Sequence, residues 1–337
     1  MIQQAIQHLI EGRDLDREAA RGVMDEIFRG EATGAQIGGF LVALRCKGET
    51  VDEIAGFAQA MRERATPIRG GREPLVDTCG TGGDGLGTFN ISTTVAFVAA
   101  GAGLCVAKHG NRAMSSQCGS ADVLQELGVN VEASPEQVGR CLDEAGIGFL
   151  FAPKLHGAMK HAIGPRRELG TRTVFNILGP LTNPAGARRQ LIGVYDGGLT
   201  SRMAGVLQAL GSERAFVVRG ADGLDEITLT GPSTVSELKE GAITTYEVEP
   251  GDFGFEPVSL GALKGGKAAQ NAAILRGVLD GEVGPPRNVV IMNAAAAIAA
   301  GGLTASLEEG AALAREAIDS GRARAALTRL VEVSNRP

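Results

Sequence analysis

The amino-acid sequence predicts an α/β protein, in which a small all-helical N-terminal domain precedes a larger α/β domain with a mostly parallel central sheet. Three observations lead to this prediction. Residues 1–65 carry helical patterns only, and a linker rich in proline and glycine follows at 66–74 (TPIRGGREP). From Leu75 onwards, short apolar or β-branched runs alternate with helical patterns, as in a parallel sheet covered by helices. We therefore expect domains at 1–70 and 71–337.

The helical domain is predicted from capping residues and apolar periodicity. Asp14 or Asp16 can cap one helix, and a second helix is expected over about 35–47. Thr50 and Glu53 have the spacing of a capping box at the start of a third. The apolar residues of this third helix share one face, which we expect to be buried: Ile54, Phe57, Ala58 and Met61.

Five short runs are predicted as strands of the α/β domain: LVDT, LCVAKHG, IGFLF, QLIGVYD and RAFVVRG. Helical patterns lie between them, at 91–101, 120–127, 135–145 and 200–210. Within 226–249, the alternation in ITLT and ITTYEVE predicts a small antiparallel insertion. The tail from residue 268 is predicted to be helical, and 289–303 to be a buried helix.

Composition and charge exclude several classes of protein. The net charge of −6 opposes nucleic-acid binding, which needs a basic face. The first residues lack the features of an export signal, and no apolar run matches a membrane span. The five cysteines include no CxxC pair, so we expect reduced thiols, a cytoplasmic location and no structural zinc.

Glycine makes up 49 of the 337 residues, about twice the usual share of roughly 7%. Its densest cluster is the segment 80–87 (GTGGDGLG), between a predicted strand and a predicted helix. Backbone amides without side chains, next to a helix N-terminus, form an anion site. A flexible turn is the alternative that the loop alone leaves open.

The same loop satisfies the pattern GxGxxG through Gly80, Gly82 and Gly85. A dinucleotide site also needs an acidic residue about 20 positions further on, which would hold the ribose hydroxyls. This sequence has Lys108 to Arg112 (KHGNR) at that place. Cations suit a phosphate better than a ribose, so the dinucleotide interpretation is rejected.

Two further segments are rich in polar groups. Asn90 to Thr94 (NISTT) opens the helix after the glycine loop, and Lys108 to Ser116 (KHGNRAMSS) ends a strand. With the loop, they form donor-rich clusters at the carboxyl ends of successive strands, where open α/β sheets bind ligands. The pattern predicts a phosphate-bearing ligand.

A polyphosphate normally binds with Mg²⁺, which is held by one or two carboxylates. The best candidates are Asp225 and Glu226, in a glycine-bearing loop after a strand, although a capped turn is an alternative. Arg166, which follows Gly-Pro, can present its guanidinium to a carboxylate, or it is an ordinary surface arginine.

Five blocks together resemble the anthranilate phosphoribosyltransferase family: DTCGTGGDGLGTFNIST, KHGNRAMSSQCGSADVLQELGV, HGAMKHAIGPRRELGTRTVFNILGPLTNPA, GLDEI and QNAAIL. They span residues 77–276 in the family's order. The family implies a fold of the nucleoside phosphorylase/phosphoribosyltransferase type, with the active site in a hinge cleft and a helical contribution from about 155–185. It also implies a homodimer joined through the helical domain.

The reaction implied by the resemblance joins anthranilate to 5-phosphoribosyl-1-pyrophosphate (PRPP), giving N-(5-phosphoribosyl)anthranilate and pyrophosphate. The implied Mg²⁺ ligands are Ser92, Asp225 and Glu226, and the implied anthranilate site is Gly80, Asn111 and Arg166, with His109 and His156 beside it. No general base is assigned. The expected PRPP site is the largest set: Gly80, Gly83, Asp84, Thr88, Asn90, Ile91, Ser92, Thr93, Lys108, Asn111, Arg112, Ser115, Ser116 and Ser120.

Two other functions are compatible with this fold. A pyrimidine nucleoside phosphorylase would not need the Asp225–Glu226 pair, and a non-catalytic nucleic-acid-binding relative would have a basic surface and eroded motifs. The chain departs from the family pattern at Gly157, where HPAMKH is common, and this affects the expected shape of the acceptor channel.

Overall fold

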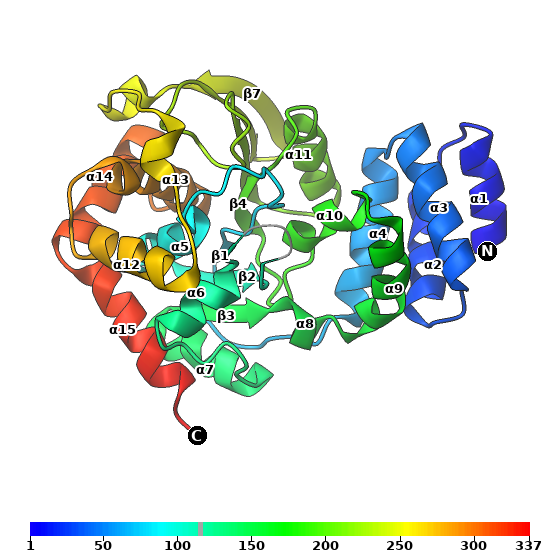
Figure 1. The fold of residues 1–337 in the computed structure, drawn as a ribbon, viewed down its shortest axis with the longest axis horizontal. Helices are drawn as coiled ribbons and strands as arrows, with labels where there is room; N and C mark the ends of the chain where they lie inside the picture. Colours follow the sequence, from blue (N-terminus) through cyan, green and yellow to red (C-terminus); the bar gives the residue numbers. More distant parts are fainter. Residues whose placement is uncertain (114–116) are drawn as a thin grey trace.

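The computed structural model of the protein describes residues 1–113 and 117–337 (Figure 1). Its N-terminal part is a bundle of helices: α1 (Ile2–Ile10), α2 (Arg17–Phe28), α3 (Gly34–Lys47) and α4 (Val51–Arg64). The Asp16 side chain accepts a hydrogen bond from the Ala19 amide at the start of α2, and Thr50 and Glu53 form the predicted capping box of α4. The predicted apolar face of α4 is buried.

Two helices from the middle of the chain lie against this bundle, α9 (Lys160–Leu169) and α10 (Phe175–Leu178), and the short helix α8 (Ala152–Leu155) precedes them. Helix α9 packs against α2 and α3, and Figure 1 shows α9 and α10 next to α4. The ring of Phe175 in α10 has its centre 6.5 Å from that of Phe28 in α2. Helices that are far apart in the sequence therefore pack together in this part of the molecule.

The α/β part is built on one seven-stranded sheet with the order β3-β2-β1-β4-β5-β6-β7. Strands β1 to β5 are parallel, which confirms the predicted mostly parallel sheet, and β6 and β7 are antiparallel. The strand order changes direction between β1 and β4, and open α/β sheets bind ligands at the carboxyl ends of the strands at such a point. The strands are β1 (Leu75–Asp77), β2 (Cys105–Gly110), β3 (Ile147–Phe151), β4 (Arg189–Gly193), β5 (Arg214–Gly220), β6 (Ser233–Lys239) and β7 (Ala242–Val248).

The antiparallel pair differs from the prediction. The ITLT segment at 227–230 is not a strand, because the hydroxyls of Thr228 and Thr230 both donate to Asp222, each at 2.8 Å, and hold a turn. The antiparallel strands are β6 and β7 instead, and β6 pairs with β5. The hairpin thus extends the main sheet.

Helices cover both faces of the sheet: α5 (Ile91–Gly101), α6 (Ser120–Glu126), α7 (Pro135–Ala145), α11 (Leu199–Ala209), α12 (Ala268–Leu279), α13 (Pro285–Gly301), α14 (Leu307–Asp319) and α15 (Arg322–Ser334). In α13, every residue from Val289 to Gly301 is buried, as predicted for a buried helix. Among the helices of the described residues, none is long and apolar enough to span a membrane.

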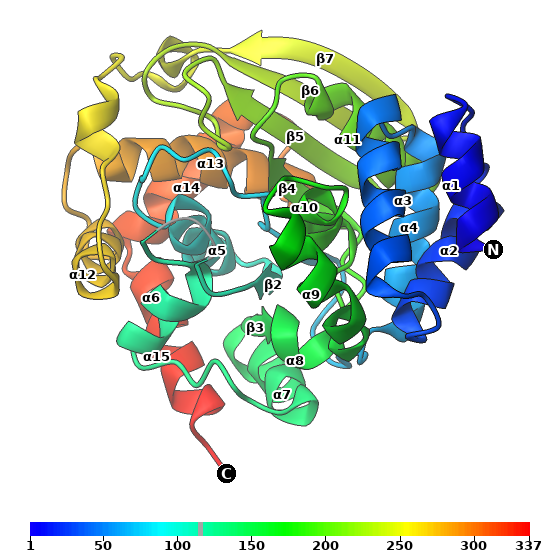
Figure 2. The same cartoon turned by 45° about the vertical axis from the view of Figure 1, so that its right-hand side comes forward.

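Alternate residues of the central strands face two different cores. Leu191 of β4 belongs to the core around α13, whereas its neighbour Ile192 belongs to a second core. This second core also contains Leu207 of α11 and Phe57 of α4, so it continues from the sheet into the helical bundle. Figure 2 shows α11 between the sheet and the bundle.

Candidate active site

The glycine loop, Gly80–Gly87, follows β1 at the point where the strand order changes direction. Open α/β sheets bind their ligands at such points. Four of its glycines, at 82, 83, 85 and 87, have φ between 63° and 87°, which L side chains rarely adopt. The loop conformation therefore depends on glycine, as does the close approach of a ligand to its amides.

Strand β4 holds the base of the loop. The Thr81 amide donates a hydrogen bond of 2.8 Å to the carbonyl oxygen of Gly193, the last residue of β4. A Cβ atom added to Gly193 would lie 1.5 Å from the backbone oxygen of Asp225. Because only glycine fits there, Asp225 lies directly beside the loop: a Cβ on Gly80 would be 3.5 Å from its carboxylate.

The segment 263–266 holds the far end of the loop. Lys264 Nζ donates to the Leu86 carbonyl oxygen at 2.6 Å, and the Gly265 amide donates to the Gly87 oxygen at 3.0 Å. Thr88, an expected PRPP contact, forms a β-bridge with Lys264. These contacts fix the end of the loop where it enters α5.

Arg172 reaches the middle of the loop from the segment between α9 and α10. Its guanidinium donates to the Gly83 carbonyl oxygen and lies 4.2 Å from the centre of the Tyr195 ring. Tyr195 follows β4, so one arginine connects the loop, the sheet and the segment before α10. Sequence reasoning missed Arg172, which stands out only as one of several basic residues.

Three carboxyl groups meet beside the loop: Asp84, Asp225 and Glu226. Burial, followed by the charge of the neighbouring Asp84, raises the pKa of Asp225 to about 7. Burial and the charge of Asp225 raise the pKa of Glu226 well above its usual value, while Lys108 and the Ser92 amide oppose the rise. Burial and mutual repulsion disfavour the charged forms of these carboxyl groups, and a bound cation would stabilise those forms.

Lys108 is buried next to these carboxyl groups, with 3% of its surface exposed. Its Nζ donates to the Thr78 carbonyl oxygen at 3.2 Å and to Ser92 Oγ at 3.4 Å. Ser92 lies in the first turn of α5, so the predicted metal ligands Ser92 and Glu226 share this one lysine as a neighbour. The cation of Lys108 balances part of the acidic charge.

Asn90 occupies the N-cap position of α5, but its side chain does not cap the helix. Its Nδ2 donates to the Cys118 carbonyl oxygen at 3.1 Å, and its Oδ1 accepts from Asn271 at 2.8 Å. Asn271 belongs to the QNAAIL block on α12, and its function in positioning Asn90 was not predicted. Ile91 and Thr93 are buried, and the Thr93 hydroxyl has no hydrogen-bond partner within the described part of the chain.

Hydrogen bonds hold the segment after β2 against the start of α6. Ser120 Oγ accepts from the Asn111 amide and donates to the Asn111 carbonyl oxygen, both at 3.1 Å. Arg112 is turned toward α6, where it donates to Asp122 at 3.1 Å and to Gln125 at 3.0 Å. Asn111 and Ser120 are thus directly joined, whereas the guanidinium of Arg112 already has protein partners.

The structure therefore brings many of the expected residues together around the loop, namely Gly80, Gly83, Asp84, Thr88, Asn90, Ser92, Lys108, Asp225 and Glu226. Ser115 and Ser116 lie outside the described residues.

His109 and His156 form a buried pair at the end of β2, with 3.2 Å between their Nε2 atoms. His109 Nδ1 donates to the Gly179 carbonyl oxygen at 3.1 Å, which leaves its Nε2 to accept from His156. Burial lowers the pKa of His109 to about 3 and that of His156 to about 4. Both rings are therefore neutral at pH 7, and the pair adds no charge to this side of the site.

Asp77 and Asn183 fix the position of His109 in this pair. Asp77 is fully buried and accepts from the His109 amide at 3.1 Å and from Asn183 Nδ2 at 2.8 Å. Burial raises the pKa of Asp77 to about 6, against the opposing charge of Lys108. Sequence reasoning missed both residues; the available signals were an aspartate at the end of a buried strand and an asparagine between two turn-forming residues.

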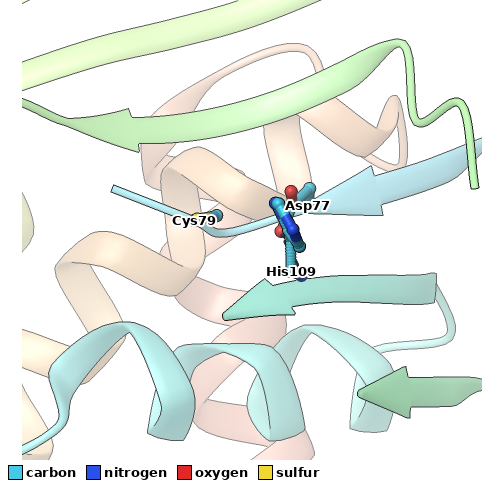
Figure 3. Close-up of side chains that lie close together, drawn as sticks. All are labelled: Asp77, Cys79 and His109. Carbon is cyan, nitrogen blue, oxygen red and sulfur yellow. Dashed lines mark hydrogen bonds between the residues drawn. The ribbon is translucent and has the colours of Figure 1, made fainter. Parts of the chain in front are cut away.

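Asp77, Cys79 and His109 lie close enough together to suggest a metal site (Figure 3). Their chemistry does not fit one. Both Asp77 oxygens accept hydrogen bonds, and both His109 ring nitrogens have partners. Burial raises the pKa of the Cys79 thiol, which opposes the thiolate that a metal needs. We therefore assign these residues to the structural support of the site.

Arg166 lies on α9, which packs against the helical bundle. Its guanidinium is 4.9 Å from the centre of the Phe175 ring, and burial lowers its pKa. Among the described residues it has no ion-pair or hydrogen-bond partner, so its donors are available to a ligand.

Comparison with known proteins identifies the family of this chain. Residues 3–65 match the family described as "Glycosyl transferase family, helical bundle domain", and residues 72–324 match "Glycosyl transferase family, a/b domain". The chain is 57% identical to an anthranilate phosphoribosyltransferase of Moorella thermoacetica, with 98% of each chain covered.

Solved structures give the same result. The crystal structure of anthranilate phosphoribosyltransferase from Thermus thermophilus is 47% identical and superposes with a TM-score of 0.93 over 98% of this chain and 99% of that one. Two Saccharomyces cerevisiae structures, one in complex with PRPP and Mg and one with 4-fluoroanthranilate, are 28% and 27% identical, with TM-scores of 0.90 and 0.89. Both cover 99% of this chain and 97% of their own. This chain therefore belongs to the anthranilate phosphoribosyltransferase family.

Proposed function

We propose that this chain transfers the phosphoribosyl group of PRPP to the amino group of anthranilate, giving N-(5-phosphoribosyl)anthranilate and pyrophosphate, as a step of tryptophan biosynthesis. The observation that carries the proposal is the meeting of the glycine loop with Lys108, Asp84, Asp225 and Glu226 at one edge of the sheet. A nucleoside phosphorylase would not need this acidic group.

PRPP is proposed to bind with its pyrophosphate on the amides of the glycine loop and the N-terminus of α5. Asp225 and Glu226, with Ser92, would hold Mg²⁺, because this ion prefers oxygen ligands. Lys108 balances only part of the negative charge of the acids, so a further cation is favoured here. When bound, Mg²⁺ stabilises the negative charge of the leaving pyrophosphate. Lys108 adds a fixed positive charge on the same side.

Anthranilate is proposed to bind between Asn111 and Arg166, with Gly80 between the two substrates. Arg166 would pair with its carboxylate. The amino group of anthranilate is a weak nucleophile, and the C1–pyrophosphate bond breaks through an oxocarbenium-like state, so correct placement supplies much of the rate. The neutral histidine pair lines this region and adds no charge that would compete with the anthranilate carboxylate for Arg166.

The reaction is tested with the purified protein through the fluorescence of anthranilate. Its emission is expected to fall with time when both PRPP and Mg²⁺ are present, and to stay constant when either is omitted or when inorganic phosphate replaces PRPP. Constant emission in the complete mixture would contradict the proposed reaction.

Replacing Arg166 by Ala is expected to raise the KM for anthranilate by about tenfold or more, since a hydrogen bond to a charged group contributes about 1.5–3 kcal/mol. The KM for PRPP should change little. Initial rates at varied concentrations of each substrate give both constants. Arg167→Ala, at an exposed neighbouring position, is the matched control. An unchanged KM for anthranilate would remove Arg166 from the acceptor site.

Replacing Arg172 by Met is expected to raise the KM for PRPP several-fold, because Met keeps the contact with Tyr195 but cannot donate to Gly83. Arg172→Lys, which retains a donor, should recover part of the affinity. The KM for anthranilate serves as the internal control. If both substrates were affected equally, Arg172 would have a general structural function and none specific to the loop.

We also propose a homodimer joined through the helical domain, which comprises 1–70 and about 155–185, beside the α/β domain of 71–337. Large apolar side chains are exposed on this domain: Ile10 on α1, Val42 on α3 and Ile163 on α9. These helices neighbour one another, since α3 packs against both α1 and α9, and exposed apolar side chains on them support association. No disulfide links the cysteines of residues 1–113 and 117–337, which supports the proposed cytoplasmic location, where thiols stay reduced.

A further inference from the structure

One polar side chain is buried in the apolar helix α13, which packs against β1, β4 and β5. Asn293 is fully buried, and the other residues of the buried run from Val289 to Gly301 are Val, Ile, Met, Ala and Gly. Burying a side-chain amide costs free energy unless its polar atoms find hydrogen-bond partners. The partners of Asn293 therefore show what this residue does.

Asn293 binds the backbone of Ile227, the residue that follows Glu226. Its Oδ1 accepts a hydrogen bond from the Ile227 amide at 2.8 Å, and its Nδ2 donates to the Ile227 carbonyl oxygen at 2.8 Å. Nδ2 also donates to the Val289 carbonyl oxygen at 2.9 Å, one turn earlier in α13. A flipped amide would place Oδ1 against two carbonyl oxygens, so this orientation is the one that the partners allow.

Ile227 depends on this side chain for its backbone hydrogen bonds. It belongs to the ITLT segment, which is not a strand, and within residues 1–113 and 117–337 its amide and carbonyl have no main-chain partner. Buried backbone groups are nearly always paired. Asn293 thus supplies the two hydrogen bonds that a neighbouring strand would otherwise provide.

The acidic pair Asp225–Glu226 lies between two anchored residues, Leu224 and Ile227. Both are fully buried in the core that contains α13. The Leu224 amide donates to Asp222 Oδ1 at 3.1 Å, and the Leu224 carbonyl oxygen accepts from the Gly220 amide at 2.9 Å. On the other side of the pair, the asparagine amide of α13 is the hydrogen-bonding anchor. The direction of both carboxylates therefore depends on how these two ends are held.

We propose that Asn293 is a positioning residue for the Mg²⁺ site: it fixes the backbone at Ile227 and so holds the carboxylates of Asp225 and Glu226 where the ion would bind. It acts through the backbone, because both protons of its Nδ2 are donated within the protein. This role rests on the proposed function, in which the two carboxylates bind Mg²⁺. Loss of a residue that orients metal ligands typically lowers metal affinity about 10- to 100-fold.

Ile298 offers a control position in the same helix. It is fully buried, so Ile298→Ala leaves a cavity and lowers stability. It lies toward the C-terminal end of α13, where the Gly301 carbonyl oxygen accepts from Arg189 Nη1 at 2.7 Å. Arg189 is the first residue of β4, so this end of the helix lies away from the carboxyl ends of the strands. Ile298→Ala therefore separates general destabilisation from a shift of the two carboxylates.

The test is Mn²⁺ binding to the whole protein without PRPP or anthranilate, followed by the EPR signal of the free ion. Asn293→Ala is expected to raise the Kd for Mn²⁺ about 10- to 100-fold, and Ile298→Ala to leave it unchanged. Asn293→Ser, which keeps one hydrogen-bonding group, should give an intermediate Kd and replaces Asn293→Ala if that variant does not fold. In turnover, the Mg²⁺ concentration for half-maximal rate should rise in Asn293→Ala while the KM for anthranilate stays the same.

An unchanged Kd for Mn²⁺ in Asn293→Ala, or an equal rise in Ile298→Ala, would overturn the role of Asn293 and leave the metal site standing. The variant Asp225→Asn with Glu226→Gln reveals a failure of the proposed function. If its Kd for Mn²⁺ matched that of the unsubstituted protein, the carboxylates would not bind the ion, and the positioning role would fail together with the metal assignment.

Discussion

Replacing Asp225 by Asn and Glu226 by Gln together is expected to lower kcat/KM by about 10³-fold or more while the protein stays folded. The proposed Mg²⁺ ion loses its two carboxylate ligands, and a metal ion at such a position contributes several kcal/mol to the transition state. The fold should tolerate the change, because both side chains keep their shape and two buried, mutually repelling acids are removed. Turnover at saturating Mg²⁺ and the melting temperature are both measured.

The Asp143–Glu144 pair is the matched control, since it is also an adjacent Asp–Glu pair but lies exposed on α7. Asp143→Asn with Glu144→Gln should leave Mg²⁺-dependent turnover nearly unchanged. Full activity in the Asp225→Asn, Glu226→Gln variant would contradict the metal assignment. Lost activity together with a collapsed melting temperature would show that the pair acts through the fold.

Replacing Gly193 by Ala is expected to destabilise the protein by about 3 kcal/mol or more and to abolish most of the activity. The added Cβ would overlap the backbone of Asp225, so a main-chain segment has to move. That movement displaces both carboxylates proposed to bind Mg²⁺ and also disturbs the Thr81–Gly193 hydrogen bond at the base of the glycine loop. Thermal unfolding and turnover are the two measurements.

Gly197→Ala provides the comparison. Gly197 lies in the same segment after β4, but a Cβ there would be 3.6 Å from the nearest atom, the side chain of Arg219. That is an ordinary contact, and the variant should have nearly normal stability and activity. If Gly193→Ala behaved like Gly197→Ala, the close packing of β4 against the Asp225 segment would not be required.

The features that could be predicted from the sequence are those that depend on residues close together along the chain. The Thr50–Glu53 capping box formed as expected, because such a box needs only residues three positions apart. The glycine loop was located by its composition and by the strand before it. The prediction of a strand at ITLT was wrong, because two threonine hydroxyls bind Asp222, a contact that alternation of polar and apolar residues does not reveal.

Contacts between distant parts of the chain were the ones that sequence reasoning missed. Asn183 reaches Asp77 across 106 positions, and Asn271 reaches Asn90 across 181. Each asparagine looks ordinary in its own segment. Their functions depend on the tertiary arrangement, in which β1 lies beside β2 and β4 and α12 packs against α5 and α6.

The continuous second core constrains how the helical bundle can move relative to the sheet. Ile192 on the sheet, Leu207 on α11 and Phe57 on α4 belong to one apolar cluster. Swinging the bundle widely away from the sheet would expose that cluster to water, at about 25 cal/mol for each Å² of apolar surface. Small sliding of packed helices, the shear type of domain motion, keeps the cluster covered. Substrates would therefore enter and products leave by shear movements of α4 and α11, and the two domains would stay in contact throughout the cycle.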